Sequence, residues 1–142
     1  MGRKPLEPRA DREIFVVPLT VQPEHIDENG HVNNVVYVGW LQEAGTAHWN
    51  ARFDLATRAK WSWVALRHEI DYLRGIGPEA TGVVARTWVG DPDGPRFNRY
   101  VRIEDGDGRL CAQGISEWCL VDARTLRPAR IPADMLPKFQ RA

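Results

Sequence analysis

Hydrophobic and polar positions divide the chain into a first strand, one long helix and four further strands. Residues 14–21 are largely apolar and β-branched, which predicts a strand, and Pro18 within them indicates a sheet edge or a bulge. The polar stretch 22–30 contains turn-forming residues, so it predicts a loop. Directly after this loop the apolar pattern changes from the period of a strand to that of a helix.

The predicted helix begins at Asn33 or Asn34, because asparagine is a favoured helix cap, and continues for about 18–20 residues. Its apolar face combines positions three or four apart, namely Val36, Trp40, Ala44, Ala47 and Ala51, with Tyr37, Leu41 and His48 beside them. Gly39 and Gly45 each lower the helix propensity by about 1 kcal/mol, which indicates tight packing. Gly39 is the position where we expect another backbone to approach closely. Residues 53–60 are expected to form a short extension or an irregular link.

The next part of the chain alternates as strands do, with turn-forming residues between successive strands. The strands are predicted at residues 61–73, 81–89, 96–104 and 109–121. In the first of them, alternation places on one side Trp63, Ala65, Arg67, Glu69 and Asp71. Residues 105–108 give the clearest hairpin signal. A strand, a long helix and four consecutive antiparallel strands predict an α+β fold.

The length of 142 residues suits a single domain, which we expect to span residues 1–142. Residues 1–12 are charged and contain proline, so they are expected to form a flexible N-terminal arm. Residues 122–142 contain three prolines and are expected to form an extended C-terminal tail, with a short helical turn at residues 133–138.

Charge and composition exclude several classes of partner. The chain has 19 Lys and Arg residues and 19 Asp and Glu residues, so its formal net charge is zero. Nucleic-acid binding and polybasic membrane anchoring both need a basic surface, so neither is expected, whereas neutrality favours self-association. Cys111 and Cys119 are too few for a disulfide framework and are expected to be free thiols. Residues 1–11 lack an apolar leader and the longest apolar run is residues 35–41, so we expect a cytoplasmic protein.

The densest polar cluster, residues 25–34, lies where the first loop meets the helix. It adjoins a helix N-terminus, whose unpaired N–H groups can stabilise a developing oxyanion. Asp27 could act there as a general base or nucleophile, and His31 could donate a hydrogen bond or move a proton. The same residues also fit ordinary helix caps and Asx-turns. A metal site at His25, Asp27 and His31 is disfavoured because no further ligand is apparent, so no metal or other cofactor is expected.

The loop and the start of the helix share a motif with a known enzyme family. The motif Asp27-x-x-Gly30-His31-Val32-Asn33-Asn34-x-x-Tyr37 resembles the signature of the hotdog-fold thioesterases similar to 4-hydroxybenzoyl-CoA thioesterase. Its continuation through Trp40 to Glu43 is similar to the plant acyl-ACP thioesterases. The resemblance implies a hotdog fold, in which an antiparallel β-sheet wraps around one long central helix. It also implies a thioesterase that hydrolyses an acyl-CoA or acyl-carrier-protein thioester.

The resemblance also assigns roles to particular residues. Asp27 would attack the thioester or activate water, and the backbone N–H of Asn34 would polarise the thioester carbonyl. Asn29 and His31 match polar catalytic positions, and Glu69 is a weaker catalytic candidate that also fits an exposed strand carboxylate. The implied substrate-binding residues are Gly30, Asn33, Tyr37 and Trp40. The resemblance implies a homodimer or homotetramer with its active sites at the subunit interface.

Two other functions are left open, namely a hotdog enoyl thioester hydratase and a non-catalytic acyl-CoA binding module. The tryptophans in and after the helix fit core packing or the lining of an acyl or aryl pocket; they are Trp40, Trp49, Trp61 and Trp63. The arginines considered as contacts for CoA phosphates are Arg58, Arg86, Arg96 and Arg99. His48 and His68 are expected to face the interior.

Overall fold

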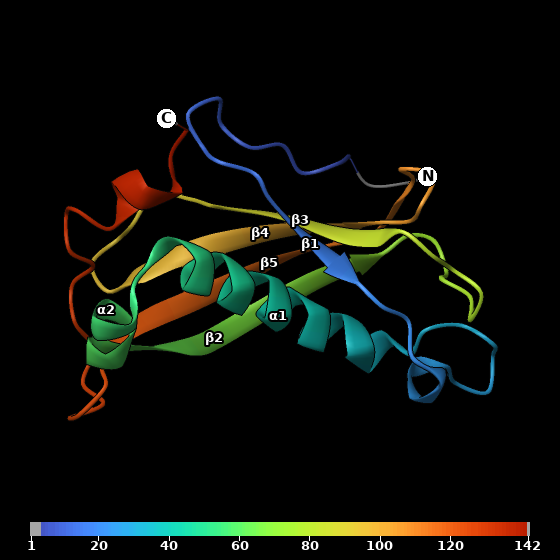
Figure 1. Cartoon of the computed structure of the whole chain (residues 1–142), viewed down its shortest axis with the longest axis horizontal. Coiled ribbons are helices and arrows are strands. Elements are labelled where there is room, and N and C mark those ends of the chain that lie inside the picture. The colour runs from blue at the N-terminus through green and yellow to red at the C-terminus, as the bar shows by residue number, and fades with distance from the viewer. Residues whose placement is uncertain (1–3, 142) are drawn as a thin grey trace.

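The structure is a computed structural model and describes residues 4–141. Within these residues, a five-stranded antiparallel sheet has α1 across one face and the N-terminal segment across the other (Figure 1). The elements in chain order are β1 (Phe15–Leu19), η1 (Pro23–His25), α1 (Asn34–Arg52), α2 (Leu55–Lys60), β2 (Trp61–Tyr72), β3 (Val83–Val89), β4 (Arg96–Glu104), β5 (Leu110–Asp122) and η2 (Leu136–Phe139). This order is the predicted one, and the arrangement confirms the α+β hotdog fold.

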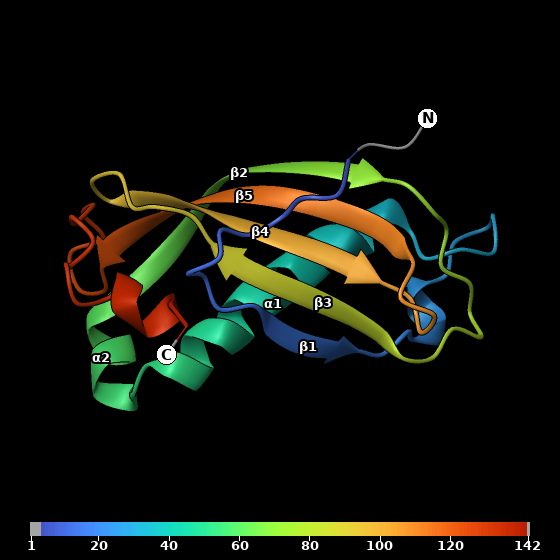
Figure 2. The same cartoon turned by 90° about the horizontal axis from the view of Figure 1, so that it is seen from above.

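The strands follow the order β1–β3–β4–β5–β2, so β1 and β2 form the two edges of the sheet (Figure 2). Pro18 lies within β1, opposite Val84 of β3. Proline has no N–H to donate to a second neighbour, and an edge strand needs none on its outer side. The edge position predicted from Pro18 is therefore confirmed.

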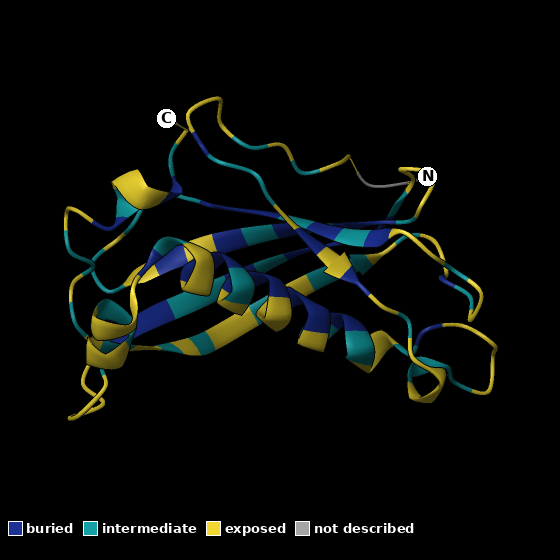
Figure 3. Cartoon of the chain, in the orientation of Figure 1, coloured by how far each residue is buried: buried dark blue, intermediate teal, exposed yellow. Residues whose placement is uncertain are grey.

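Helix α1 begins where predicted, after Asn33, whose Oδ1 accepts a hydrogen bond from the N–H of Val35 at 3.1 Å. It has 19 residues and turns a continuous stripe toward the sheet (Figure 3). The buried residues of the helix are Tyr37, Trp40, Leu41, Ala44, Gly45, His48 and Trp49. The predicted stripe is therefore rotated slightly, because Val36 and Ala47 are only half-buried and Ala51 is exposed.

No described residue approaches Gly39 closely, although another backbone was expected there, whereas a strand side chain approaches Gly45. A Cβ atom added at Gly45 would lie 3.1 Å from Cδ and Nε of Arg99, whereas one added at Gly39 would meet nothing within 4 Å. Gly45 therefore lets the guanidinium of a strand residue lie directly against the helix backbone. The prediction failed because helical spacing cannot show which glycine faces a long side chain of the sheet.

Strand β2 contains a bulge that the alternating pattern does not reveal. Its register with β5 shifts between Ala65 and Arg67, so the two halves of the strand turn opposite parities toward the helix. Trp63 contacts Trp49 of α1 with ring centroids 5.6 Å apart. Beyond the bulge, the ring of Tyr72 reaches the N-terminal half of α1. Alternation therefore holds within each half of the strand but not across the bulge. The interior side expected for His68 is right for the second half, where Ile70 and Tyr72 share that side, and does not extend to the first half.

The link between α1 and β2 contains a short helix, which agrees with the short extension expected there rather than with an irregular link. Asp54 caps α2, because its Oδ1 accepts a hydrogen bond from the N–H of Thr57 at 2.8 Å. Helix α2 leads directly into β2 at Trp61.

The N-terminal segment of the described chain is attached to the sheet by hydrogen bonds. The N–H of Leu6 donates to Oε1 of Gln113 at 2.8 Å, and Nε2 of Gln113 donates to the carbonyl of Lys4 at 3.0 Å. Arg12 is buried and donates from Nε to the carbonyl of Val89 at 2.9 Å. Residues 4–12 are thus attached to the sheet, in contrast to the loose arm expected, while residues 1–3 lie outside the described residues.

The C-terminal tail is extended over much of its length and contains η2, close to the predicted helical turn. Phe139 of η2 is buried together with Met135. These two side chains close a second apolar cluster at the C-terminal end of α1. The tail is therefore part of the core at this end of the molecule.

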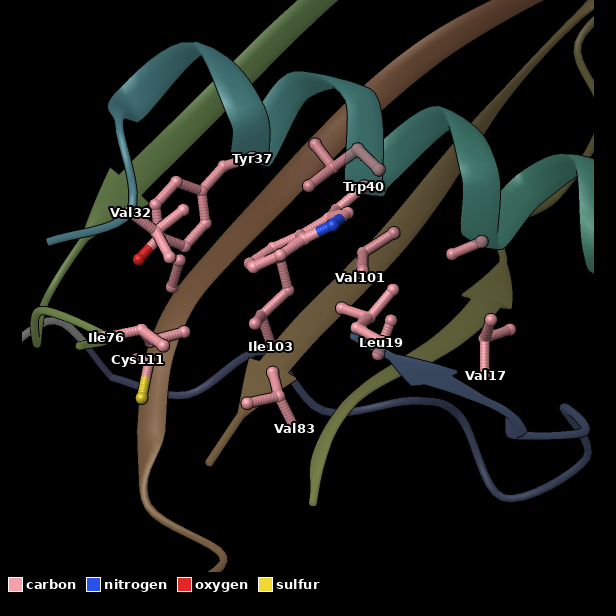
Figure 4. Close-up of a cluster of buried hydrophobic side chains, with 14 residues drawn as sticks. Val17, Leu19, Val32, Tyr37, Trp40, Ile76, Val83, Val101, Ile103 and Cys111 are labelled. Carbon is pink, nitrogen blue, oxygen red and sulfur yellow. The ribbon is translucent and has the colours of Figure 1, made fainter. Parts of the chain in front are cut away.

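The main core lies between the N-terminal half of α1 and the sheet (Figure 4). Tyr37 and Trp40 reach from the helix toward the strands, where they meet aliphatic side chains such as Leu19 and Ile103. Burying each large apolar side chain contributes about 1.5–3 kcal/mol. This packing fixes the N-terminus of α1 against one end of the sheet.

Candidate active site

The loop that carries the predicted catalytic residues is a tight hairpin-like turn. Asp27 donates its N–H to the carbonyl of His31 at 3.0 Å, and Gly30 donates its N–H to the carbonyl of Asp27 at 3.0 Å. Gly30 has a φ of 77°, a left-handed conformation that glycine adopts without steric cost. Gly30 is thus required by the turn itself.

Backbone hydrogen bonds fix this turn at the start of α1. The N–H of Val32 donates to the carbonyl of Ile76 at 2.8 Å, and the N–H of Asn33 donates to the carbonyl of His25 at 2.9 Å. The first bond ties the loop to the segment after β2, and the second joins its two ends. The turn therefore holds its side chains in a defined place beside the helix N-terminus.

The Asp27 carboxylate has one oxygen committed to the turn. Its Oδ1 accepts a hydrogen bond from the N–H of Asn29 at 2.9 Å, which is the Asx-turn considered from the sequence. Within residues 4–141, no hydrogen bond or ion pair is made by Oδ2. Asp27 is only half-buried, so this oxygen can meet a water molecule or a substrate. Asp27 can therefore stabilise the turn through Oδ1 and take part in a reaction through Oδ2.

The first turn of α1, which directly follows the Asp27 turn, leaves one backbone donor open. The N–H of Val35 donates to Oδ1 of Asn33, and the N–H of Val36 donates to its carbonyl oxygen at 2.9 Å. Among the described residues, the N–H of Asn34 has no acceptor. The carbonyl of Asn34 accepts a hydrogen bond from the hydroxyl of Tyr72 at 3.2 Å, which anchors this residue to β2. An open N–H at a helix N-terminus suits a carbonyl oxygen that gains negative charge.

The histidines of the loop have different surroundings. His31 is exposed and its ring lies over Gly75, where an added Cβ would be 3.1 Å from Cγ of His31. His25 accepts a hydrogen bond at Nδ1 from the N–H of Gln22 at 3.0 Å, and its ring meets the edge of Trp40. No group of three metal-ligating side chains occurs in the part of the chain that the structure describes. His31 is therefore the more exposed of the two loop histidines.

Tyr37 and Trp40 are buried below the loop. Tyr37 contacts Trp40 and Tyr72 with ring centroids 5.4 Å away in each case. Burial raises the pKa of Tyr37 to about 12, so its hydroxyl stays protonated. Trp40 also lines an open groove of about 660 Å³ beside α1, together with His25 and Glu43. These two aromatic residues support the loop from within the core, and Trp40 alone borders this open groove.

Glu69 is not brought to this site within the chain. The bulge in β2 turns it to the face of the sheet away from α1, where it borders a pocket with Lys4 and Leu6 of the N-terminal segment. Its carboxylate is exposed and pairs with Arg67 at 2.7 Å. Glu69 therefore lies as the exposed strand carboxylate that the sequence also fitted, and its catalytic role, which the resemblance implies, gains no support from its position in the chain.

A second polar group lies at the opposite end of α1 and was not identified as a unit from the sequence. The guanidinium of Arg99 donates from Nη1 to Nδ1 of His48 at 3.0 Å and to Oγ1 of Thr87 at 2.9 Å. Because Nδ1 of His48 accepts, Nε2 carries the hydrogen and donates to Oε1 of Glu13 at 2.7 Å. Arg52 forms two further hydrogen bonds with the Glu13 carboxylate. The interior position expected for His48 is confirmed, whereas Arg99 is buried and so is not on a surface that could hold CoA phosphates.

Burial controls ionisation in this group. It lowers the pKa of His48 to about 4, with the nearby charge of Arg99 acting in the same direction. It also lowers the pKa of Arg99 to about 9, which leaves the guanidinium protonated at neutral pH. The hydrogen bonds from Arg52 hold the pKa of Glu13 below its ordinary value. At neutral pH the group therefore contains a neutral histidine between a carboxylate and a buried cation.

Comparison with models of protein families shows the family to which the chain belongs. A model of the thioesterase-like superfamily matches residues 21–139. The chain belongs to the thioesterase-like superfamily. The matched region contains the Asp27 loop, α1 and all the strands except β1. A comparison with curated protein sequences gives no significant match.

Solved structures of thioesterases share the fold at low sequence identity. The DHNA-CoA thioesterase of Staphylococcus aureus is 19% identical with a TM-score of 0.70, over 82% of this chain and 78% of that one. A thioesterase from Thermus thermophilus, solved with coenzyme A and Zn, is 22% identical with a TM-score of 0.75, over 87% and 90% of the two chains. A 1,4-dihydroxy-2-naphthoyl-CoA thioesterase from Synechocystis is 13% identical with a TM-score of 0.76, over 89% and 96%. In the described part of this superfamily member, neither helix is both long and apolar enough to cross a membrane.

Proposed function

We propose that this protein hydrolyses an acyl-CoA or acyl-carrier-protein thioester to a free acid and a thiol. The observation that supports this most is the pairing of two open groups at one end of α1. These are Oδ2 of the Asp27 carboxylate and the backbone N–H of Asn34, both held by the hydrogen-bonded turn. Membership in the thioesterase-like superfamily supports the same reaction class.

The chemistry follows from these two groups. The thioester carbonyl oxygen accepts a hydrogen bond from the N–H of Asn34, where the helix N-terminus stabilises the negative charge that forms on it. Asp27 either takes a proton from the attacking water or attacks the carbonyl carbon itself, after which water releases the acid. The C–S bond breaks and the thiolate leaves with a proton. Asn29 and His31, which are exposed beside the carboxylate, orient the water and the substrate.

We propose further that two copies pair through β2. Strand β2 is a free edge of 12 residues that exposes Val64 and Leu66, whereas the other edge is short and contains Pro18. A long edge with exposed apolar side chains is a template for pairing with another strand. A homodimer formed in this way would continue the sheet and place two helices on the same face. Cys111 and Cys119 are buried free thiols, which supports a reducing, cytoplasmic location.

The test is a hydrolysis screen with short, long and aromatic acyl-CoAs on the wild type and on Asp27→Asn. The asparagine side chain can still accept the hydrogen bond from Asn29, so the turn and the fold are expected to persist while hydrolysis is lost. Glu28→Gln removes an exposed neighbouring carboxylate and serves as the matched control, with activity close to the wild type. Full turnover by Asp27→Asn would exclude the role of Asp27. Hydration of an enoyl-CoA without hydrolysis, or acyl-CoA binding without turnover, would identify the other functions left open by the sequence.

A further inference from the structure

A small cavity lies under the C-terminal half of α1, at the opposite end of the helix from the Asp27 loop. Its volume is about 50 Å³, which is room for a few water molecules or one small functional group. The walls come from the helix, three strands and the C-terminal tail. The side chains that matter here are Trp49, Trp63, Phe97, Arg99, Trp118 and Phe139.

One wall of this cavity carries a buried positive charge. Arg99 is 3% exposed, and no carboxylate among residues 4–141 lies within 4 Å of its guanidinium. The hydrogen bonds that it makes run from Nη1 to two neutral acceptors, His48 and Thr87. Glu13 is kept apart from it, because the ring of His48 stands between them. Removing an ion from water costs several kcal/mol unless a counter-charge is supplied, and the chain supplies none directly.

Trp118, which also lines this cavity, carries a donor without a partner among the described residues. The indole Nε1 of Trp118 is buried and has no hydrogen-bond acceptor within the described chain. Buried polar atoms in folded proteins nearly always have a partner, so an exception calls for one. Around these two donors the walls are aromatic, and the guanidinium carbon of Arg99 lies 5.8 Å from the ring centre of Phe97 and 5.6 Å from that of Phe139. A cation and an N–H donor surrounded by aromatic side chains are suited to binding a single anionic group.

We propose that this cavity binds a carboxylate at the end of the substrate's acyl group, with Arg99 and Trp118 as its donors. This inference rests on the proposed thioesterase function and narrows its substrate class to thioesters whose acyl part carries a second, negatively charged end. Neutral acyl chains would leave the buried guanidinium without a counter-charge. Selectivity would therefore come from this cavity, while the reaction takes place at the Asp27 loop.

The proposed pairing through β2 brings the two places together. Within one chain, Asn34 and Gly45 are eleven residues apart, which is about 16 Å along the helix. Tyr72 marks the Asn34 end of β2 and Trp63 marks the cavity end. If β2 pairs antiparallel with its copy, each Tyr72 end lies beside the Trp63 end of the other chain. That pairing would bring the Asp27 loop of a second copy toward the cavity end of β2, and the inference requires a short acyl group with a terminal carboxylate to span the two.

Binding can be measured without any turnover, because three tryptophans line the cavity. The probe is butanoate, with butanamide as its neutral counterpart; neither absorbs where tryptophan is excited. We expect butanoate to change the intrinsic fluorescence in a saturable way and butanamide to have at least tenfold weaker affinity, since hydrogen bonds to charged groups are the stronger ones. Equal responses to the two compounds, or no response to either, would overturn the proposal.

Two variants test whether butanoate binds in this cavity. Arg99→Gln is expected to abolish the preference for butanoate, and Trp118→Phe, which keeps an aromatic ring and removes the N–H, is expected to weaken butanoate binding several-fold. Should Arg99→Gln fail to fold, Trp118→Phe decides the matter. Arg58→Gln, at a half-buried arginine of α2 that does not line the cavity, is the control and should bind like the wild type. Unchanged butanoate binding in Trp118→Phe would count against the cavity as the binding place.

Hydrolysis of two acyl-CoA substrates tests this inference separately from the proposed function. Glutaryl-CoA and pentanoyl-CoA share a five-carbon acyl chain and differ by a terminal carboxylate, and we expect kcat/KM to favour glutaryl-CoA by at least tenfold in the wild type. Arg99→Gln or Trp118→Phe should reduce that ratio. Hydrolysis of both at equal rates would overturn the inference and leave the thioesterase function standing. Selective butanoate binding with no hydrolysis of any thioester would overturn the function and leave the anion site standing.

Discussion

The hydrogen bond between Arg99 and His48, 3.0 Å from Nη1 to Nδ1, fixes the charge state of the histidine. An arginine always donates, so Nδ1 of His48 must be an unprotonated acceptor. Nε2 then donates to Glu13, and all the hydrogen-bonding capacity of the ring is used. Protonating this buried ring would place a hydrogen against the guanidinium of Arg99. The fold is thus built around a histidine that stays neutral.

Stability is therefore expected to fall as the pH is lowered from about 6.5 to about 4. The pKa of His48 is about 4 in the folded protein against 6.5 as its ordinary value. Between these values the unfolded chain binds a proton that the folded chain does not, so unfolding is favoured progressively as pH falls. The loss approaches about 3 kcal/mol across this window. The lowered pKa of Glu13 acts in the same sense, since its contribution is lost as pH falls through its folded pKa. Urea unfolding at several pH values measures the slope.

His48→Gln is the matched variant for this pH dependence. A glutamine amide can accept from Arg99 and donate to Glu13, but it does not titrate. The unfolding free energy of this variant should change much less between pH 6.5 and pH 4 than that of the wild type. The same slope in both proteins would show that other groups cause the acid sensitivity.

The two glycines of α1 should respond differently to alanine. At Gly39 the added Cβ meets open space, so Gly39→Ala is expected to stabilise the helix by about 0.5–1 kcal/mol. At Gly45 the added Cβ would lie 3.1 Å from the side chain of Arg99, which hydrogen bonds hold in place. The clash should cancel the propensity gain or exceed it, making Gly45→Ala the less stable of the two. Thermal unfolding of both variants gives the comparison, and an equal gain in both would show that Arg99 moves aside freely.

Local sequence patterns predicted the helices and strands well, but they did not predict how these elements contact one another. Helix α1, the Asn33 cap and the edge position of Pro18 all follow from short-range rules, because caps, periods and proline act over a few residues. The bulge in β2 does not, since the register shift after Ala65 depends on how β5 pairs with it. Because of this displacement, Trp63 and Glu69, which alternation places on one side of the strand, lie on opposite faces of the sheet. The motif around Asp27 was found because all its parts are adjacent in the chain.

The buried group at the other end of α1 shows why some sites escape sequence reasoning. Arg99 and His48 are 51 positions apart, and no local sequence pattern around either residue indicates contact with the other. His48 is predicted as buried by the helical period, but its partner comes from the centre of the sheet. Only the packing of α1 across β4, allowed by Gly45, brings them into contact. A single arginine at an inward strand position was the one available signal, and it equally fitted a phosphate contact.

A charged residue on the free edge should separate the proposed pair of subunits. Leu66 is 49% exposed on β2, at the bulge and in the middle of the strand. In an antiparallel pair centred there, Leu66→Asp would place two like charges close together, which opposes association. Leu55→Asp is the control, because Leu55 is 76% exposed on α2 and lies away from the edge. Sedimentation velocity should show a smaller species for Leu66→Asp alone, with thioester hydrolysis lost in the same variant if the site needs both copies. A monomeric wild type that hydrolyses thioesters fully would contradict the pairing through β2.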